Sequence, residues 1–292
     1  MSTTHYKDVK GILSAQNGMN LYRGCTHGCI YCDSRSACYQ MDHAFEDVEI
    51  KRNAPRLLED ALRRKRRRCM ISTGSMCDPY LPLEKQERLT RRCLTLIDRY
   101  EFGFSVITKS DLILRDLDLL GSINEKTKCV VQMTLTTMDE ALCRVLEPNV
   151  CTTARRAEVL NLLRDEGIPT VVWLCPILPF INDTEENLRG ILDYCFAAKV
   201  KGIICFGMGV TLREGDREYF YNKLDEHFPG LKERYIDAFG NRYSCNSPNH
   251  GALMKIFRAQ CKEHGVLHSP DAVFAYLSEF EDKKAGEQMT LF

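Results

Sequence analysis

The sequence has no excess of charge of either sign, since 40 lysine and arginine residues balance 40 aspartate and glutamate residues in 292. The protein as a whole is therefore not a polycation built to coat nucleic acid, although a local basic patch stays open. No apolar run approaches the roughly 20 residues that span a bilayer. Residues 1–10 also lack the basic-then-apolar pattern of a signal peptide. We therefore expect a cytoplasmic protein without a membrane partner.

Cysteine is the residue that the chain has in abundance. Of its 15 cysteines, most lie singly in apolar segments, where a free thiol in a reducing compartment behaves as a small buried hydrophobic group. Only Cys25, Cys29 and Cys32 are clustered, and the others form no further C-x-x-C pair. A second site built on a local cysteine motif is therefore not expected.

Neither an internal repeat nor a low-complexity linker divides the chain, so we expect one domain. Its expected parts are a lead-in over 1–18, a core over 19–230 and a C-terminal extension over 231–292, with a poorly ordered polar tail from Glu279 onward.

Apolar, β-rich segments alternate with helical patterns along the core. The expected strands are Met19–Arg23, Cys69–Thr73, Phe104–Thr108, Cys129–Thr136, Pro169–Leu178 and Gly202–Met208. The expected helices are Pro55–Arg67, Leu83–Arg99, Asp111–Ile123, Thr152–Glu166, Thr184–Ala198, Asp216–Phe228 and, after a turn-rich stretch, Gly251–His264. This alternation predicts parallel strands joined by right-handed crossovers, in a doubly wound sheet or a partial barrel.

The clustered cysteines have C-x3-C-x2-C spacing, with Tyr31 directly before the last of them. Three thiolates on one glycine-containing loop can surround a small inorganic centre. The set is one ligand short of a closed zinc site or an electron-transfer iron–sulfur cluster, so it leaves an open coordination position for chemistry. The alternative is a zinc site completed by His27 or His43, although zinc prefers four protein ligands.

Polar residues follow the C-terminal ends of the expected strands. After the cysteine loop come Ser72–Tyr80, Thr108–Ser110, Thr134–Thr137 and the pair Asn182-Asp183. Each segment alone could be an ordinary loop. Because functional groups collect at this edge of parallel α/β folds, their shared location favours a site.

These motifs together resemble the radical S-adenosylmethionine (SAM) enzymes, and among them the spore photoproduct lyase-like group. The resemblance covers residues 19–209 and rests on the cysteine loop, Gly74–Tyr80 with Pro82 and Glu84, Ile107–Ser110, Thr134–Thr137 and Glu147-Pro148. It implies an α/β fold, a partial (β/α)6 TIM-like barrel with a C-terminal helical extension. No motif identifies a substrate.

The resemblance also implies the cofactors. Cys25, Cys29 and Cys32 would bind three irons of a [4Fe–4S] cluster and leave the fourth iron for SAM. An electron from the reduced cluster would cleave SAM, and the 5′-deoxyadenosyl radical would abstract a hydrogen atom from an unidentified substrate. This reduction requires a low-potential donor such as flavodoxin or ferredoxin.

The contacts to SAM follow from the same resemblance. Asp78 is expected to bind the amino group of the methionine moiety and Lys109 its carboxylate, because opposite charges match a zwitterion. Tyr31 is expected to flank the adenine. Glu147 is either a polar ligand or a helix-end glutamate before proline. Hydroxyl contacts are expected from Ser75, Thr134 and Thr136, although threonine is also a good strand residue.

Two departures from the lyase pattern bear on the reaction. Spore photoproduct lyase uses a cysteine on this strand-end loop as a hydrogen-atom donor, beside a tyrosine directly after the last cluster cysteine. Here Asp33 follows Cys32, and Cys77 lies next to Asp78, which is not clearly the place of the donor. The departures weigh against DNA photoproduct repair and leave Cys77 as a radical relay or a packed thiol. Nucleic-acid repair or modification stays open as an alternative.

Arg63–Arg68 is the strong charge block of the chain. Clustered arginines can pair with phosphates, so a non-catalytic zinc or iron–sulfur module that binds nucleic acid is the alternative from another functional class. Cations also complement the C-terminus of a helix. Because the next strand leads from this helix end toward the cysteine edge, we expect the block on the opposite face.

Overall fold

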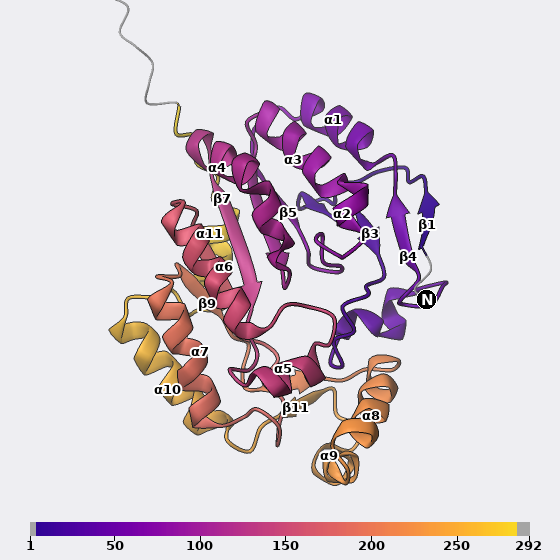
Figure 1. The fold of residues 1–292 in the computed structure, drawn as a ribbon, viewed down its shortest axis with the longest axis vertical. Coiled ribbons are helices and arrows are strands. Elements are labelled where there is room, and N and C mark those ends of the chain that lie inside the picture. The colour runs from indigo at the N-terminus through magenta and orange to yellow at the C-terminus, as the bar shows by residue number, and fades with distance from the viewer. Residues whose placement is uncertain (1–3, 285–292) are drawn as a thin grey trace, which may run out of the picture.

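The computed structural model describes residues 4–284. Its centre is a six-stranded parallel sheet with the order β2-β5-β6-β7-β8-β9. The strands are β2 (Gly18–Met19), β5 (Met70–Thr73), β6 (Gly103–Thr108), β7 (Cys129–Thr134), β8 (Thr170–Trp173) and β9 (Gly202–Ile204). Their spatial order follows their chain order, whereas a doubly wound sheet would reverse it. The predicted partial barrel is therefore confirmed (Figure 1).

Helices cover the outer face of the sheet and bury one apolar side each (Figure 1). In α1, the buried residues Ala54, Leu58 and Leu62 recur at four-residue spacing, which places them on one face. All six residues of β7 are buried, as expected for a strand enclosed on both sides. The helices of this layer are α1 (Ala54–Arg64), α3 (Leu89–Arg99), α4 (Leu117–Lys126), α6 (Thr153–Asp165), α7 (Glu185–Ala197) and α10 (His250–Glu263). Among the described residues, no helix is long and apolar enough to cross a bilayer.

The expected first strand, Met19–Arg23, is wrong in detail. β2 ends at Met19, and β3 (Tyr22–Arg23) belongs to a separate sheet of order β1-β4-β3 with β1 (Thr4–Lys7) and β4 (Val48–Lys51). Strands of two residues are defined by pairing with distant segments, so they leave no periodic pattern in the sequence.

The expected helix Leu83–Arg99 is broken at Arg88, where φ is +49°. The short α2 (Glu84–Glu87) precedes the break and α3 follows it. The buried Glu84 carboxylate accepts hydrogen bonds from the backbone N–H groups of Leu89 and Thr90, at 2.9 and 2.6 Å. These bonds satisfy donors at the start of α3, which allows the chain to restart the helix there.

Other boundaries also differ from expectation. α1 ends at Arg64 rather than Arg67, and the segment expected as the helix Asp111–Ile123 begins with the 3-10 turn η3 (Asp111–Asp116) before α4. The sequence pattern missed α5 (Glu140–Leu146), α9 (Leu231–Phe239), α11 (Pro270–Ser278) and the antiparallel pair β10 (Gly209–Thr211) and β11 (Ser244–Asn246). The expected helix near 216–228 is α8 (Asp216–His227), and Thr184 caps α7 by accepting from Asn187 N–H.

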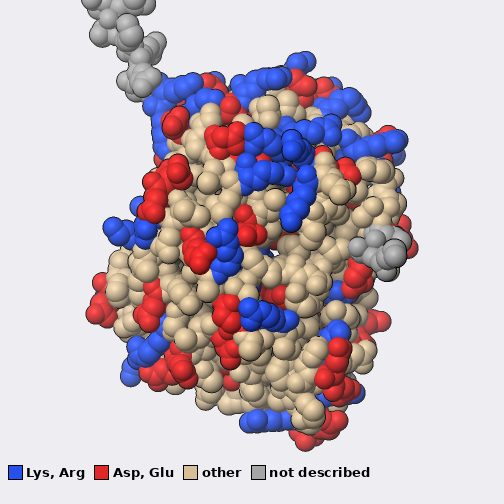
Figure 2. All heavy atoms as spheres, viewed as in Figure 1, with Lys and Arg blue, Asp and Glu red and all other residues tan. Residues whose placement is uncertain are grey.

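The basic block lies at the N-terminal edge of the sheet. Arg68, two residues before β5, pairs at 2.8 Å with Glu101, two residues before β6. The block therefore lies opposite to the C-terminal edge of the sheet. Figure 2 shows the basic side chains gathered at that upper end of the molecule. Arg68 also lies 3.5 Å from Asp282. The tail is therefore held through residue 284, contrary to expectation, and the rest of the expected disorder lies outside the described residues.

Gly74, directly after β5, allows a close approach to the backbone of β6, and its replacement tests this packing. Its φ is +98°, and a Cβ there would lie 2.1 Å from the carbonyl oxygen of Ile107. Strain of this kind costs on the order of 1–3 kcal/mol, so we expect Gly74→Ala to lower the free energy of unfolding by about 2–3 kcal/mol in urea denaturation. A Cβ added at Gly121 in α4 would meet nothing within 4 Å, and Gly121→Ala should stabilise by about 0.5–1 kcal/mol. Equal stability of Gly74→Ala and wild type would contradict this account.

Candidate active site

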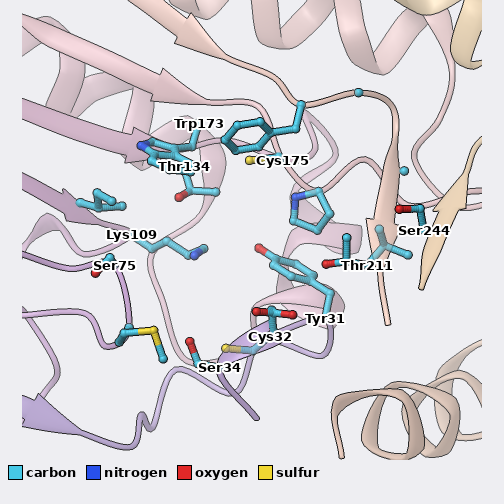
Figure 3. A pocket seen from close by; sticks show the side chains of 18 of the residues that line it. Tyr31, Cys32, Ser34, Ser75, Lys109, Thr134, Trp173, Cys175, Thr211 and Ser244 are labelled. Carbon is cyan, nitrogen blue, oxygen red and sulfur yellow. The ribbon is translucent and has the colours of Figure 1, made fainter. Parts of the chain in front are cut away.

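A cavity of about 480 Å³ opens at the C-terminal edge of the sheet. Lys109 and Tyr31 point into it from opposite walls, with Cys32 beside Tyr31 (Figure 3). Five residues predicted from sequence line the cavity: Tyr31, Cys32, Ser75, Lys109 and Thr134. The loops that the strand-end rule selected therefore meet in space.

The cysteine loop is held on both flanks by backbone hydrogen bonds. Cys25 N–H donates to the carbonyl of Phe45 at 2.8 Å, and Ile30 N–H donates to the carbonyl of Leu146 at 3.0 Å. Gly24 has a φ of +90°, and a Cβ there would lie 2.6 Å from the Phe45 oxygen. Only glycine allows the backbone to approach this closely. The loop is therefore shaped by its supports before any cofactor binds.

The arrangement of the three thiols does not match a tetrahedral zinc site. Zinc with bonds of about 2.3 Å requires tetrahedral sulfur ligands about 3.8 Å apart. Within residues 4–284, the three cysteine sulfurs belong to no group of three possible ligand atoms that all lie within 4.8 Å of one another. His27 is buried with its Nδ1 3.5 Å from Asp78, and His43 is grouped with His5 and Glu49 instead. Neither histidine completes a zinc site with the thiols.

Lys109 supplies a positive charge inside the cavity. Within the described part of the chain, its ammonium group forms no hydrogen bond or ion pair. Burial alone would lower the pKa of Lys109, but the neighbouring Cys29 and Glu147 side chains raise the pKa above its ordinary value. Lys109 thus stays charged and is available to an anionic ligand.

Asp78 lies outside the cavity lining. Its carboxylate accepts hydrogen bonds from the Thr108 hydroxyl and from the backbone N–H groups of Lys109 and Tyr80, each at 2.8 Å. These bonds tie the loop after β5 to the end of β6 and fix the backbone of Lys109. The geometry therefore gives Asp78 a positioning role, and its expected contact with SAM stays a prediction.

Cys77 also lies outside the lining, behind the cysteine loop. Its thiol donates to the carbonyl of Gly24 at 2.7 Å, and burial raises the pKa of Cys77. This placement favours the packed thiol over the radical relay.

Tyr31, Glu147 and Arg156 form a buried network beside the cavity. The Tyr31 hydroxyl and the Arg156 guanidinium both donate to the Glu147 carboxylate. Arg156 also donates to the carbonyl of Thr134 at 2.7 Å. Burial alone would raise the pKa of Glu147, but the charges of Arg156 and Lys109 hold the pKa below its ordinary value. Thr136 reaches this carboxylate at 3.4 Å rather than the cavity.

Sequence reasoning missed much of the outer wall. Trp173 follows the strand-end rule at the end of β8, as does Phe206 after β9, so that rule could have found both. Thr211 and Ser244 come from β10 and β11 and had no such signal (Figure 3). Asp33, also in the lining, is held by the Tyr39 hydroxyl at 2.7 Å.

Comparisons with known proteins show the family of the chain. A model of the radical SAM superfamily matches residues 19–195. An uncharacterized protein of Mycobacterium tuberculosis is 30% identical over 227 residues, covering 76% of this chain and 66% of the relative. One of Methanocaldococcus jannaschii is 32% identical over 176 residues, covering 60% of this chain and 65% of the relative. The chain thus spans just under two thirds of each relative's length.

Solved structures show the same fold at low identity. A single-residue variant of spore photoproduct lyase superposes with a TM-score of 0.64 at 13% identity, covering 91% of this chain and 82% of that one. A complex of that lyase with AdoMet and dinucleoside spore photoproduct gives a TM-score of 0.60 at 11% identity, covering 85% and 74%. The methyltransferase TsrM of Kitasatospora setae, with cobalamin and a [4Fe–4S] cluster bound, gives 0.53 at 14% identity, covering 82% and 52%.

The buried network makes a prediction about stability. Glu147→Gln leaves the interior charge of Arg156 without its counterion, and we expect a loss of about 3–5 kcal/mol in the free energy of unfolding. Tyr31→Phe removes one donor but keeps the ion pair, so a loss of about 1–2 kcal/mol is expected. Urea denaturation followed by circular dichroism measures both. A larger loss for Tyr31→Phe than for Glu147→Gln would refute the central role of the ion pair.

Proposed function

Because the chain belongs to the radical SAM superfamily, we propose that it uses a [4Fe–4S] cluster to cleave SAM reductively and to abstract a hydrogen atom from a substrate bound in the cavity. The observation that carries the proposal is the unpaired, charged ammonium group of Lys109 beside the thiols of Cys29 and Cys32. A cation at this place matches the carboxylate of a ligand whose amino acid end sits at the cluster.

The residues in and beside the cavity have distinct roles in this proposal. Cys25, Cys29 and Cys32 hold the cluster, which when bound supplies the one-electron chemistry. Lys109 binds the carboxylate of SAM. Tyr31 packs beside the adenine, and its hydroxyl is tied to Glu147, so the ring has a fixed orientation.

The outer wall limits access of water to the reacting atoms. Trp173, Pro176 and Phe206 give this wall an apolar surface, and Val210 of β10 continues it. Excluding water protects a reactive radical from side reactions. A flavodoxin or ferredoxin is the proposed physiological source of the electron.

The proposed reaction is tested by anaerobic reconstitution with iron and sulfide, followed by SAM and dithionite. We expect 5′-deoxyadenosine from wild type and none from Cys29→Ala, which lacks one thiolate of the cluster. Lys109→Met should keep its iron content but raise the SAM concentration for half-maximal rate about 10-fold or more, because it loses a charge-assisted hydrogen bond.

Cys38→Ala is the matched control, since Cys38 is exposed and lies beyond the motif. It should retain both iron and SAM cleavage. A colourless, zinc-bound wild type that makes no 5′-deoxyadenosine would refute the enzyme proposal.

A nucleic-acid substrate is the second candidate, supported by an aromatic group at the cavity mouth. Trp173 lies edge-on to Phe206 at 6.0 Å, and Phe206 stacks with Phe274 at 6.2 Å. Phe206 is 63% exposed, which is unusual for so large an apolar side chain. Exposed aromatic rings are platforms for unpaired bases.

Trp173 is the single tryptophan of the chain, so its fluorescence reports on this surface. If the cavity takes unpaired bases, a single-stranded oligonucleotide should quench Trp173. Phe206→Ala should then weaken binding about 5-fold or more, since stacking contributes roughly 1–3 kcal/mol per base. Replacing arginines of the block Arg63–Arg68 should change binding much less. If the arginine replacements weaken binding more than Phe206→Ala does, the nucleic acid binds at the N-terminal edge of the sheet instead.

A further inference from the structure

A second group of potential metal ligands lies outside the cavity, on the sheet formed by β1, β4 and β3. One ligand atom from each of His5, His43 and Glu49 lies within 4.8 Å of the other two. Two imidazoles and a carboxylate are a common donor set for zinc and related ions. Neither the cysteine motif nor the proposed reaction uses these residues.

The pairing of β1 with β4 brings two of the ligands together. His5 lies directly opposite Glu49 in the parallel register, so both side chains project from the same face of the sheet. Glu49 is almost fully buried. The loop between η2 (Ala37–Tyr39) and β4 then brings His43 over this face, with its ring 4.9 Å from that of His5.

Both histidines have an oxygen beside their Nδ1 atom. His5 Nδ1 lies 3.1 Å from a carboxylate oxygen of Asp47, and His43 Nδ1 lies 3.0 Å from the carbonyl oxygen of Ala44. Each oxygen accepts only, so each Nδ1 carries the proton and the Nε2 of the neutral ring keeps its lone pair. A carboxylate or carbonyl on the other ring nitrogen is the usual support of a metal-binding histidine.

The His43 Nε2 atom is buried and has no hydrogen-bond partner among the residues that the structure describes. Its nearest acidic oxygen, from Asp42, is 3.9 Å away, which is too far for a hydrogen bond. A buried nitrogen without a partner is costly unless something binds it.

We propose that His5, His43 and Glu49 bind a divalent transition-metal ion, for which zinc is the best probe. A tetrahedral zinc ion with bonds of about 2.0–2.1 Å needs ligand atoms about 3.4 Å apart, so atoms within 4.8 Å of one another approach by at most about 1.4 Å. The His5 side chain is 39% exposed and can make this adjustment. Water completes the coordination.

Three cations are neighbours of the same carboxylate, and one of them, Lys51, donates to the carbonyl of Asn20 at 2.8 Å. Lys7 Nζ lies 2.8 Å from one oxygen of Glu49, and the half-exposed lysine can swing into solvent when a metal binds. Arg23 lies opposite Glu49 on β3, but it donates to the carbonyls of Tyr39 and Gln40 at 3.0 and 2.8 Å. Arg23 thus holds the start of the loop from Gln40 to Asp47, called the histidine loop because it carries His43.

The metal would brace the cysteine loop from outside. The segment from His43 to Asp47 includes Phe45, whose carbonyl accepts from Cys25 N–H. Fixing His43 to β1 therefore also fixes a support of the cluster loop. This role is structural and does not depend on the proposed reaction.

The test is zinc binding to protein whose [4Fe–4S] cluster has been reconstituted, so that the thiols are occupied. After dialysis against zinc, elemental analysis should find one zinc per chain in addition to the iron. His5→Ala and His43→Ala should each weaken zinc binding at least about 100-fold. Asp47→Asn should weaken it about 10-fold, since support residues contribute that much.

His227→Ala is the matched control, because His227 lies 3.4 Å from a glutamate oxygen but has no second histidine in such a group. It should bind zinc as wild type does. Cobalt(II) in place of zinc should show visible ligand-field bands without a thiolate charge-transfer band. Equal zinc content in wild type and His43→Ala, no zinc in wild type, or a thiolate band would each overturn the proposal.

Discussion

The buried carboxylate of Glu147 is the interaction on which the candidate active site depends. It accepts from Tyr31 of the cysteine loop and from Arg156 of α6, and Arg156 continues to the carbonyl of Thr134 at the end of β7. Three separate parts of the chain are thereby joined behind the cavity. A charge this deep is stable only with its counterion and full hydrogen bonding, so the geometry of all three parts is coupled.

The same carboxylate takes part in the charge balance of the cavity. Cys29 and Glu147 are neighbours of Lys109 and raise its pKa above the ordinary value despite its burial. Asp78 fixes the backbone of Lys109, and among the described residues the ammonium group forms no hydrogen bond or ion pair. The protein therefore holds a positive charge at the strand ends that is available to an anionic ligand.

The cysteine loop is supported from its other flank by the small sheet. Phe45 lies just before β4, and its carbonyl accepts a hydrogen bond from Cys25 N–H. Gly24 allows the two backbones to approach this closely. The histidine loop leads into this same segment. The cysteine loop thus depends on two independent supports, the Glu147 network on one side and the N-terminal sheet on the other.

The sequence by itself determined the parallel α/β alternation, the cysteine spacing and most of the inner cavity wall, because strand ends of a parallel sheet share one edge. Tyr31, Ser75, Lys109 and Thr134 meet there as that rule requires. Local patterns could not reveal the partner of Glu147, the bonds that tie Asp78 to the end of β6, or the pairing of His5 with Glu49. Those were decided by tertiary structure, because a buried charge or a two-residue strand takes its role from whichever distant segment packs against it.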